Sequence, residues 1–503
     1  MELFNVKFVL LYTDALLYLL LFIVVAYVLY ARRHAHLTAP WKRLATDSVA
    51  MGSVAILLAY AIIGLADSIH FRAKQESVPS DTVVVNDTET TQTETAQTPE
   101  PDKTIYSTEV KSLLDLWLQK LQDKDEKTYS APLATHLHAK ESIEQADGSV
   151  LRDFPRLKHG GAHLTDIHTK NTDIFKKVLL GVFIGLIWSL LLLIILTTRQ
   201  WLKYRKNQSL NSLTWLNSIS HILKSNHPES KTRWRAFWII GTITLITSSV
   251  LWHLSNSYHV LGTDKIGQDV LYQALKSIRT GLLIGTLTTL VMLPFAIFMG
   301  IAAGYFRGWI DDVIQFIYTT LNSIPGVLLI AAAILMLSVY LDNNAEQFNS
   351  LLQRTDMRLL FLCIILGITS WTGLCRYLRA ESLKLREMDY IAAARSQGVG
   401  HLTILGRHIL PNVMHIVLIT VALDFSGLVL AEAALAYVQI GVDPTTESWG
   451  NMINGARLEM AREPIVWWSL AAAFIFMFIL VLAANLFADA VRDALDPKEV
   501  IDE

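Results

Sequence analysis

Residues 389–411 read DYIAAARSQGVGHLTILGRHILP and lie between two long apolar stretches. Asp389 belongs to a residue type that caps the free amides at a helix N-terminus. Gly398 belongs to the type that ends a helix in the left-handed conformation. The stretch therefore predicts a short helix over residues 390–397, capped by Asp389, closed by Gly398 and followed by a stop at Pro411.

The predicted helix has little side-chain surface of its own. Three consecutive alanines, Ala392 to Ala394, leave it nearly bare. A bare helix can enter a groove of another protein. The plainer alternative is a cytoplasmic loop that only joins two membrane helices.

The stretch resembles the EAA loop of bacterial ABC importer permeases, which has two alanines, a glycine and a Leu-Pro pair at fixed spacing. The positions that fit this spacing are Ala393, Ala394, Gly398, Leu410 and Pro411. Two positions depart from the family pattern: Ala392 stands where an acidic residue is usual, and His408 stands where isoleucine is common. In the family this loop docks on the ATPase subunit, and the resemblance implies that residues 379–411, including Asp389, do the same here.

Further motifs extend the resemblance over residues 259–498. In order they are His259-Val-Leu-Gly-Thr-Asp264, Gly267-Gln-Asp-Val270, Gly304-Tyr-Phe-Arg-Gly-Trp309, Ala431-Glu-Ala-Ala-Leu435, Ser448-Trp-Gly450 and Asp489-Ala-Val-Arg-Asp-Ala-Leu-Asp-Pro497. The series is similar to the second permease subunit of dipeptide and oligopeptide importers. It implies an all-α polytopic fold in which six of the helices form a type I ABC permease core.

Composition also indicates a membrane protein, because 52% of the 503 residues are hydrophobic and only 17% are charged. About 20 helical residues cross a hydrocarbon core of about 30 Å. Nine stretches approach or reach that length, and the sequence predicts nine transmembrane helices. They lie near 9–30, 48–66, 178–197, 236–252, 278–304, 314–340, 359–378, 412–438 and 466–488.

The short loops that carry lysine and arginine predict the orientation. Basic clusters follow the first span, join the third and fourth, and surround residues 379–411. These clusters fall on one side, which we take as cytoplasmic. The N-terminus is then outside, the C-terminus is in the cytoplasm and residues 67–177 are outside, in a bacterial cytoplasmic (inner) membrane. The clusters are topology signals, and no nucleic-acid partner is expected.

These features predict the organisation of the chain. The predicted parts are two N-terminal helices in 1–66, an external segment over 67–177, a membrane hairpin over 178–252, a permease core over 253–498 and a tail over 499–503. Within the external segment, residues 77–104 have the composition of a flexible linker, and Val110, Leu113, Leu114, Trp117 and Leu121 recur at helical spacing. Either the second or the fourth span could be the opening helix of the core.

Pairs of small residues and prolines mark the fifth and sixth spans. The pairs Gly281/Gly285 and Gly300/Gly304 permit close helix approach. Pro294 and Pro325 are expected to interrupt the two spans. The two cysteines, Cys363 and Cys375, are about 18 Å apart along one helix, which is too far for a disulfide.

Five histidines of the external segment form a candidate metal site: His136, His138, His159, His163 and His168. Imidazole is a common ligand for zinc, nickel and copper. The segment has no HExxH pattern, and a chance cluster of surface histidines is the alternative.

Two acidic residues fall within the eighth span. Asp424 and Glu432 are eight residues apart, about 80° around a helix, so both could face one polar cavity. In a proton-coupled carrier they would form a candidate relay, which is the main alternative from another class of transporter. Packing or cavity roles are the interpretation that fits the resemblance.

The chain contains no GxxxxGK[ST] phosphate loop, so it is not expected to hydrolyse ATP itself or to hold a cofactor. The resemblance implies a paralogous permease subunit, two cytoplasmic ATPase subunits that bind ATP and Mg²⁺, an external substrate-binding protein and a peptide substrate. Nickel complexes and antimicrobial peptides are alternative substrates in this broad family. A non-transport scaffold would explain the extra N-terminal mass but not the EAA-like loop.

Overall fold

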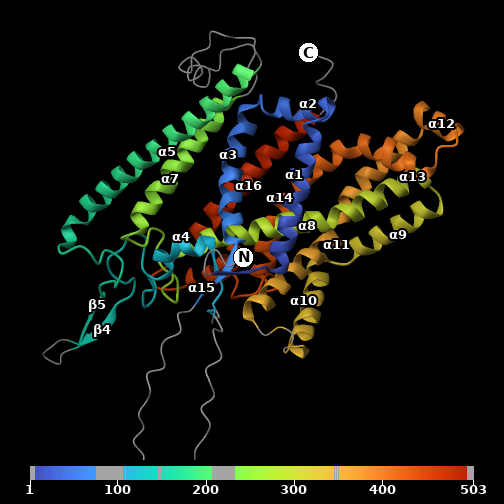
Figure 1. The fold of residues 1–503 in the computed structure, drawn as a ribbon. Coiled ribbons are helices and arrows are strands. Elements are labelled where there is room, and N and C mark those ends of the chain that lie inside the picture. The colour runs from blue at the N-terminus through green and yellow to red at the C-terminus, as the bar shows by residue number, and fades with distance from the viewer. Residues whose placement is uncertain are drawn as a thin grey trace, which may run out of the picture.

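The computed structural model describes residues 6–74, 106–107, 109–144, 150–206, 233–344, 346, 348 and 350–495. Within these ranges nine helices are long and apolar enough to cross a membrane, in agreement with the nine predicted spans (Figure 1). They are α1 (Tyr12–Ala31), α3 (Ser48–Asp67), α5 (Lys170–Lys206), α7 (Trp234–Ser255), α8 (Val270–Phe306), α10 (Gly326–Asn343), α11 (Leu351–Arg386), α14 (Leu410–Tyr437) and α16 (Trp468–Leu495).

Shorter elements connect the long helices. They are α2 (Ala35–Leu44), α4 (Leu113–Gln122), the 3-10 helix η1 (Ile167–Thr169), α9 (Trp309–Ser323), α12 (Asp389–Ser396), α13 (His401–Ile404), the π-helical turn η2 (Leu405–Ile409) and α15 (Trp449–Glu459). In the described residues β1 (Val6–Val9) pairs antiparallel with β2 (His70–Ala73), β2 pairs with β3 (Lys111–Ser112), and β4 (Glu141–Glu144) forms a hairpin with β5 (Val150–Asp153). The predicted linker over 77–104 and the tail over 499–503 lie outside the described residues.

The prolines act differently from the prediction. Pro294 lies inside α8, which continues from Val270 to Phe306 without a break. By contrast, the predicted sixth span is two helices, α9 and α10, because Pro325 cannot donate a backbone hydrogen bond and restricts Ile324 to an extended conformation.

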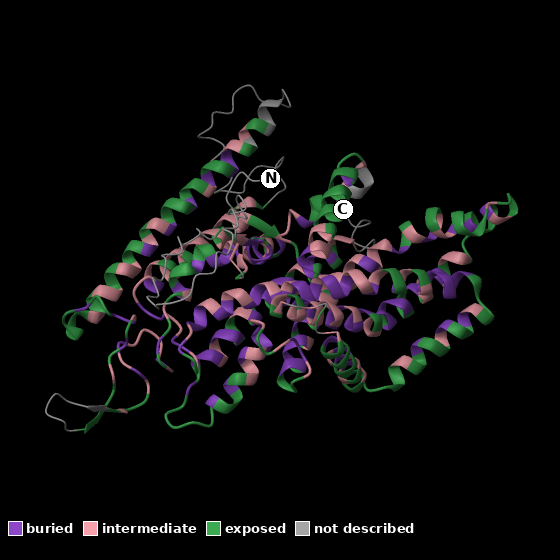
Figure 2. Cartoon of the chain, turned by 60° about the horizontal axis from the view of Figure 1, so that its bottom comes forward, coloured by how far each residue is buried: buried purple, intermediate pink, exposed green. Residues whose placement is uncertain are grey.

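The pair α8–α11 is the centre of the packing, and its glycines allow the close approach that the sequence predicts. A Cβ atom on Gly300 would lie 2.8 Å from the carbonyl oxygen of Cys375, and one on Gly304 would lie 2.6 Å from that of Arg379. The other pair packs on aromatic side chains instead: Gly281 faces Trp449, and Gly285 faces Phe425. Figure 2 shows buried residues concentrated along these central helices.

The contacts of α3 favour the second span as the opening helix of the core. Tyr60 is buried in a cluster with residues of α8, α15 and α16, and its hydroxyl donates a 2.8 Å hydrogen bond to the carbonyl of Phe476. Helix α7 contacts α3 from the outside and pairs with α5, where Gly181 and Gly185 bring the two backbones together. Helices α5 and α7 thus form an added hairpin beside the core (Figure 1).

The external segment contains the predicted amphipathic helix with altered limits. Helix α4 begins at Leu113, after a capping box formed by Ser112 and Asp115. Its buried face is Leu114, Leu118 and Leu121, whereas Trp117 is 49% exposed. The prediction was wrong for Trp117 because Leu118 and Leu121, four and seven residues after Leu114, lie within about 40° of it around the helix, whereas Trp117 lies about 60° away at the edge of that face.

Two largely enclosed cations near the start of α8, with side chains 17% and 12% exposed, join the N-terminal helices to the core. The Lys276 Nζ lies 2.9 Å from Asp67 Oδ1 of α3 and 2.8 Å from Asp115 Oδ1 of α4. The Arg279 Nη2 lies 2.7 Å from Asp14 Oδ1 of α1, and Asp14 Oδ2 contacts His70 at 2.8 Å. The network joins residues that are far apart in the sequence, and their spacing gave no prediction of it.

A second buried cluster ties the external segment to the loop before α8. Glu126 accepts hydrogen bonds from the backbone amides of Lys158, His159 and Gly160 at 2.7–3.1 Å. Its Oε1 is also 3.4 Å from His259 Nε2, and His259 Nδ1 lies 2.8 Å from Asp269 Oδ2.

These contacts shift the pKa values of His259 and Glu126. Burial alone would lower the pKa of His259, but hydrogen bonds to Asp269 and Glu126 raise it to about 9. Burial alone would raise the pKa of Glu126, but its hydrogen bonds from His259 and the three amides lower it to about 2. The charged forms of both residues are therefore those that stabilise the fold.

Replacing Lys276 by methionine should destabilise the whole chain. It would leave Asp67 and Asp115 without their buried counter-charge, a change that costs about 3–5 kcal/mol. We expect Lys276→Met to lower the midpoint of thermal aggregation of the detergent-purified protein strongly. Lys384→Met, which removes the exposed Lys384–Glu381 pair, is the matched control and should change little. Equal midpoints for both variants would contradict the role of the network.

The external segment should loosen at alkaline pH. The stabilisation from His259 is fully present below pH 6.5 and is lost as pH rises through about 9, whereas that from Glu126 is present above pH 4.5 and is lost as pH falls through about 2. Hydrogen exchange of residues 126–160, corrected for intrinsic rates, should accelerate between pH 6.5 and 9.5. His259→Gln should remove this acceleration, and His168→Gln should preserve it. An unchanged profile in His259→Gln would exclude His259 as the source.

Candidate functional site

Helix α12 is the predicted short helix of the EAA-like loop. It runs from Asp389 to Ser396, one residue earlier at each end than predicted. The predicted cap is wrong: Met388 occupies the N-cap position, and no side chain caps the helix. Asp389 is already helical, and its carboxylate stabilises α12 instead by its favourable interaction with the positive end of the helix dipole.

The C-terminal end of α12 is a Schellman motif, as the glycine predicts. The amide of Val399 donates to the carbonyl of Ala394 at 3.1 Å, and the amide of Gly398 donates to that of Arg395 at 3.0 Å. Gly398 has φ +74°, which confirms the left-handed conformation. A Cβ there would meet nothing within 4 Å, so the backbone, not space, requires glycine.

The alanines of α12 divide between two faces. Ile391 and Ala394 are buried in a cluster with Ile404 and Ile409, whereas Ala392 and Ala393 are exposed. The exposed face of α12 therefore presents two of the three alanines, and the third, Ala394, is buried. Large apolar side chains are also exposed on this loop: Met388 (46%), Tyr390 (40%) and Leu402 (80%).

The end of α8 anchors the loop through Tyr305. The Arg386 Nη1 donates to the Tyr305 carbonyl at 2.9 Å, and the Tyr305 hydroxyl is 2.8 Å from His401 Nδ1. The Arg395 guanidinium lies over the Tyr305 ring, 5.0 Å from its centroid. The contacts of Tyr305 with the loop were not predicted, although Tyr305 lies within the family-like motif Gly304-Tyr-Phe-Arg-Gly-Trp309.

The loop continues into α14 without the predicted stop. The π-helical turn η2 runs over Leu405–Ile409 and leads directly into α14, where Leu410 and Pro411 occupy the first turn. A proline in the first helical turn removes an amide that has no intrahelical partner. Pro411 therefore starts a membrane helix, and the loop and α14 form one continuous element.

Asp424 and Glu432 lie further along α14 in different surroundings. Glu432 is buried against α15, where its Oε1 would lie 2.6 Å from a Cβ on Gly450. This Oε1 has no hydrogen-bond partner in the described chain. Asp424 is half-buried and makes no hydrogen bond to any described residue. The two acids are thus not linked by hydrogen bonds among the residues that the structure describes.

Three of the five candidate histidines have ring contacts with different residues. His138 Nε2 lies 3.2 Å from the carbonyl of Ile465, and His163 Nε2 lies 2.8 Å from Asp173 Oδ2. His136 Nδ1 lies 3.1 Å from the Thr135 hydroxyl, whereas it is the backbone amides of His159 and His168 that donate to Glu126 and Asp166. No group of three or more histidine, cysteine or acidic residues arranged for a metal occurs in the described ranges, so the structure does not support the metal hypothesis.

Comparisons with known proteins match the C-terminal half of the chain. The family model of binding-protein-dependent transport system inner membrane components matches residues 296–500. The glutathione transport system permease protein GsiD of Pectobacterium atrosepticum is 32% identical over 245 residues, which cover 48% of this chain and 74% of that protein. The oligopeptide transport system permease protein OppC of Mycobacterium tuberculosis is 33% identical over 239 residues, which cover 48% and 76%.

Residues 296–500 contain the last turns of α8, helices α9 to α11, the EAA-like loop and α14 to α16. Matches to about three quarters of each relative, together with the short helix α12 at the expected position, establish the relationship. The chain belongs to the family of inner membrane components of binding-protein-dependent transport systems.

Proposed function

We propose that this chain is a permease subunit through which an ABC importer moves short peptides across the cytoplasmic membrane. The observation that carries the proposal is the short helix α12, closed by the Schellman motif at Gly398, whose exposed alanines Ala392 and Ala393 would offer an ATPase subunit a surface with few side-chain atoms. The coupling residues are Asp389, Ala392, Ala393, Ala394, Gly398, Leu410 and Pro411. The chain lacks a phosphate loop, so ATP and Mg²⁺ would bind to the ATPase subunits.

The partners and substrate follow from the relatives. GsiD and OppC are named as glutathione and oligopeptide permeases, which supports a peptide substrate for this chain. The transporter would contain a paralogous permease, two cytoplasmic ATPase subunits and an external binding protein. Nickel complexes and antimicrobial peptides are the other substrates to test, by competition against a labelled tripeptide.

We also propose that the N-terminus is outside and that the C-terminus and α12 are cytoplasmic. Strand β1 pairs with β2, and β2 with β3, so the N-terminal strand lies with residues 70–73 and 111–112 at one end of the molecule. Helix α12 lies at the other end of α8 and α11 (Figure 1). The basic loop clusters favour the cytoplasm for that end.

Gly398→Val should uncouple transport. Valine in the left-handed region costs about 1–2 kcal/mol or more, which would disturb the Schellman motif and tilt α12. We expect the variant to insert normally, while tripeptide uptake and recovery of the ATPase subunits on purification fall by roughly five- to thirty-fold.

Two variants provide controls for this test. Gly400→Val is matched, because Gly400 has φ −63° and an added Cβ there also meets nothing within 4 Å. Gly398→Asn should retain most activity, since asparagine tolerates the left-handed conformation. Wild-type uptake and ATPase recovery in Gly398→Val would refute the coupling role, and uptake driven by a proton gradient without the ATPase would favour a carrier.

The orientation predicts the results of reporter fusions. Fusions after residue 120 should report an external location, because α4 packs at the outer ends of α3 and α8. Fusions after residues 205, 390 and 500 should report the cytoplasm. A cytoplasmic signal at residue 120 would overturn the orientation, although it would leave the family assignment intact.

A further inference from the structure

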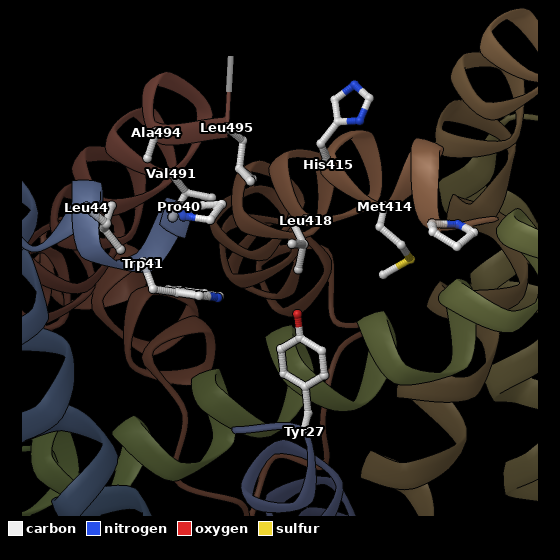
Figure 3. Close-up of a pocket in the computed structure, with 11 residues that line it drawn as sticks. Tyr27, Pro40, Trp41, Leu44, Met414, His415, Leu418, Val491, Ala494 and Leu495 are labelled. Atoms are coloured by element: carbon white, nitrogen blue, oxygen red, sulfur yellow. The ribbon is translucent and has the colours of Figure 1, made fainter. Parts of the chain in front are cut away.

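A cavity of about 170 Å³ lies where the N-terminal helices meet the C-terminal half of the chain (Figure 3). Its walls come from α1, α2, α14 and α16. The residues that carry the argument are Tyr27, Trp41, Leu44, Met414, Leu418 and Val491. The cavity is open on one side and lined mainly by apolar groups.

The inner wall is firmly packed and the rim is aromatic. Leu44 and Val491 are buried together in one cluster that joins α2 to α16. Tyr27 and Trp41 are 39% and 42% exposed, and in Figure 3 the Tyr27 hydroxyl and the Trp41 ring both face the opening between the helices. Tyrosine and tryptophan with one wet and one apolar side are typical of a membrane–water boundary.

Four basic residues flank this rim. Lys42 and Arg43 follow Trp41 on α2, and Arg32 and Arg33 follow the end of α1, a turn and a half beyond Tyr27. All four are exposed, and none has an ion pair among the described residues.

Three acidic residues that the structure describes on the neighbouring segments have partners of their own. Asp47 caps α3 by accepting from the amides of Val49 and Ala50. Asp489 and Asp493 contact Arg492 at 3.5 and 3.6 Å. Among the residues that the structure describes, the rim therefore carries unbalanced positive charge beside an apolar cavity.

We propose that this cavity binds a segment of one acyl chain of an anionic phospholipid of the cytoplasmic leaflet, with the lipid phosphate paired to the basic residues of the rim. The proposal uses the orientation given above and goes beyond the transport function. A hydrocarbon chain matches the apolar walls, and a phosphate matches the charge of Arg32, Arg33, Lys42 and Arg43. Basic residues at an anionic membrane surface each strengthen such binding several-fold.

The bound lipid would also support the coupling loop. Pro411 lines the same cavity, at the start of α14, as do Met414 and Leu418 one and two turns further on. A chain that fills the cavity would therefore brace the first turns of α14 against α2 and α16. Transport should then depend on anionic lipid as well as on the ATPase.

The test is native mass spectrometry of the purified transporter, offered dioleoyl phosphatidylglycerol or dioleoyl phosphatidylcholine. We expect the wild-type complex to retain one phosphatidylglycerol in preference to phosphatidylcholine. Lys42→Gln with Arg43→Gln should weaken that preference by roughly 30-fold, since it removes two of the four rim charges. Leu418→Trp, which fills the cavity, should reduce retention of both lipids.

The control removes two charges at the opposite end of the molecule. Lys170→Gln with Lys176→Gln on α5 should leave the preference for phosphatidylglycerol unchanged. Equal retention of the two lipids by the wild type, or an equal loss in the control and the rim variant, would overturn the proposal. Peptide uptake is measured separately, so a chain that binds the lipid but imports no peptide would refute the transport function alone.

Discussion

The ion pairs of Lys276 and Arg279 are the constraint on which the arrangement of the chain depends. A buried cation is tolerated only when carboxylates and hydrogen bonds replace its hydration. In this protein the carboxylates come from three separate N-terminal segments: Asp14 in α1, Asp67 in α3 and Asp115 in α4. The N-terminal part and the permease half therefore cannot separate without leaving charges buried and unpaired.

Helix α8 links this network to the candidate coupling site. It carries the two cations in its first three turns, packs closely on α11 through Gly300 and Gly304, and ends at Phe306, next to Tyr305, which contacts the coupling loop. Because α12 is fixed to α8 through Tyr305 and the loop continues into α14, a displacement of α12 must move both helices. The Schellman motif at Gly398 sets the angle at which α12 meets a partner.

The sequence alone was sufficient to predict the features that depend on local chemistry. Apolar length predicted the nine spans, and the φ preference of glycine predicted the end of α12 at Gly398. Features that depend on neighbouring segments were missed. Asp389 is an adequate cap in isolation, but the packing of Ile391 begins the helix one residue earlier, after Met388. The contacts that favour α3 over α7 as the opening helix are not visible in the sequence, because hydrophobicity alone does not distinguish the two helices.

Proline shows the same dependence on context. Pro294 is accommodated within α8, Pro325 separates two helices, and Pro411 begins one. The residue is identical in each case. What differs is whether the missing amide would have had a partner and whether the preceding residue is held in a helical or an extended conformation.

The environment of α14 also bears on how transport would be driven. A proton relay needs acids joined by hydrogen bonds or water, and such acids are paired or face a cavity. Glu432 is enclosed by Gly450 and α15 with one oxygen unpartnered in the described chain, while Asp424 has no hydrogen bond to a described residue. The loop at the N-terminal end of the same helix carries the surface helix α12, which ends in the Schellman motif at Gly398 and contacts α8 through Tyr305. A mechanical input at α12 therefore requires fewer unobserved elements than a proton relay through Asp424 and Glu432.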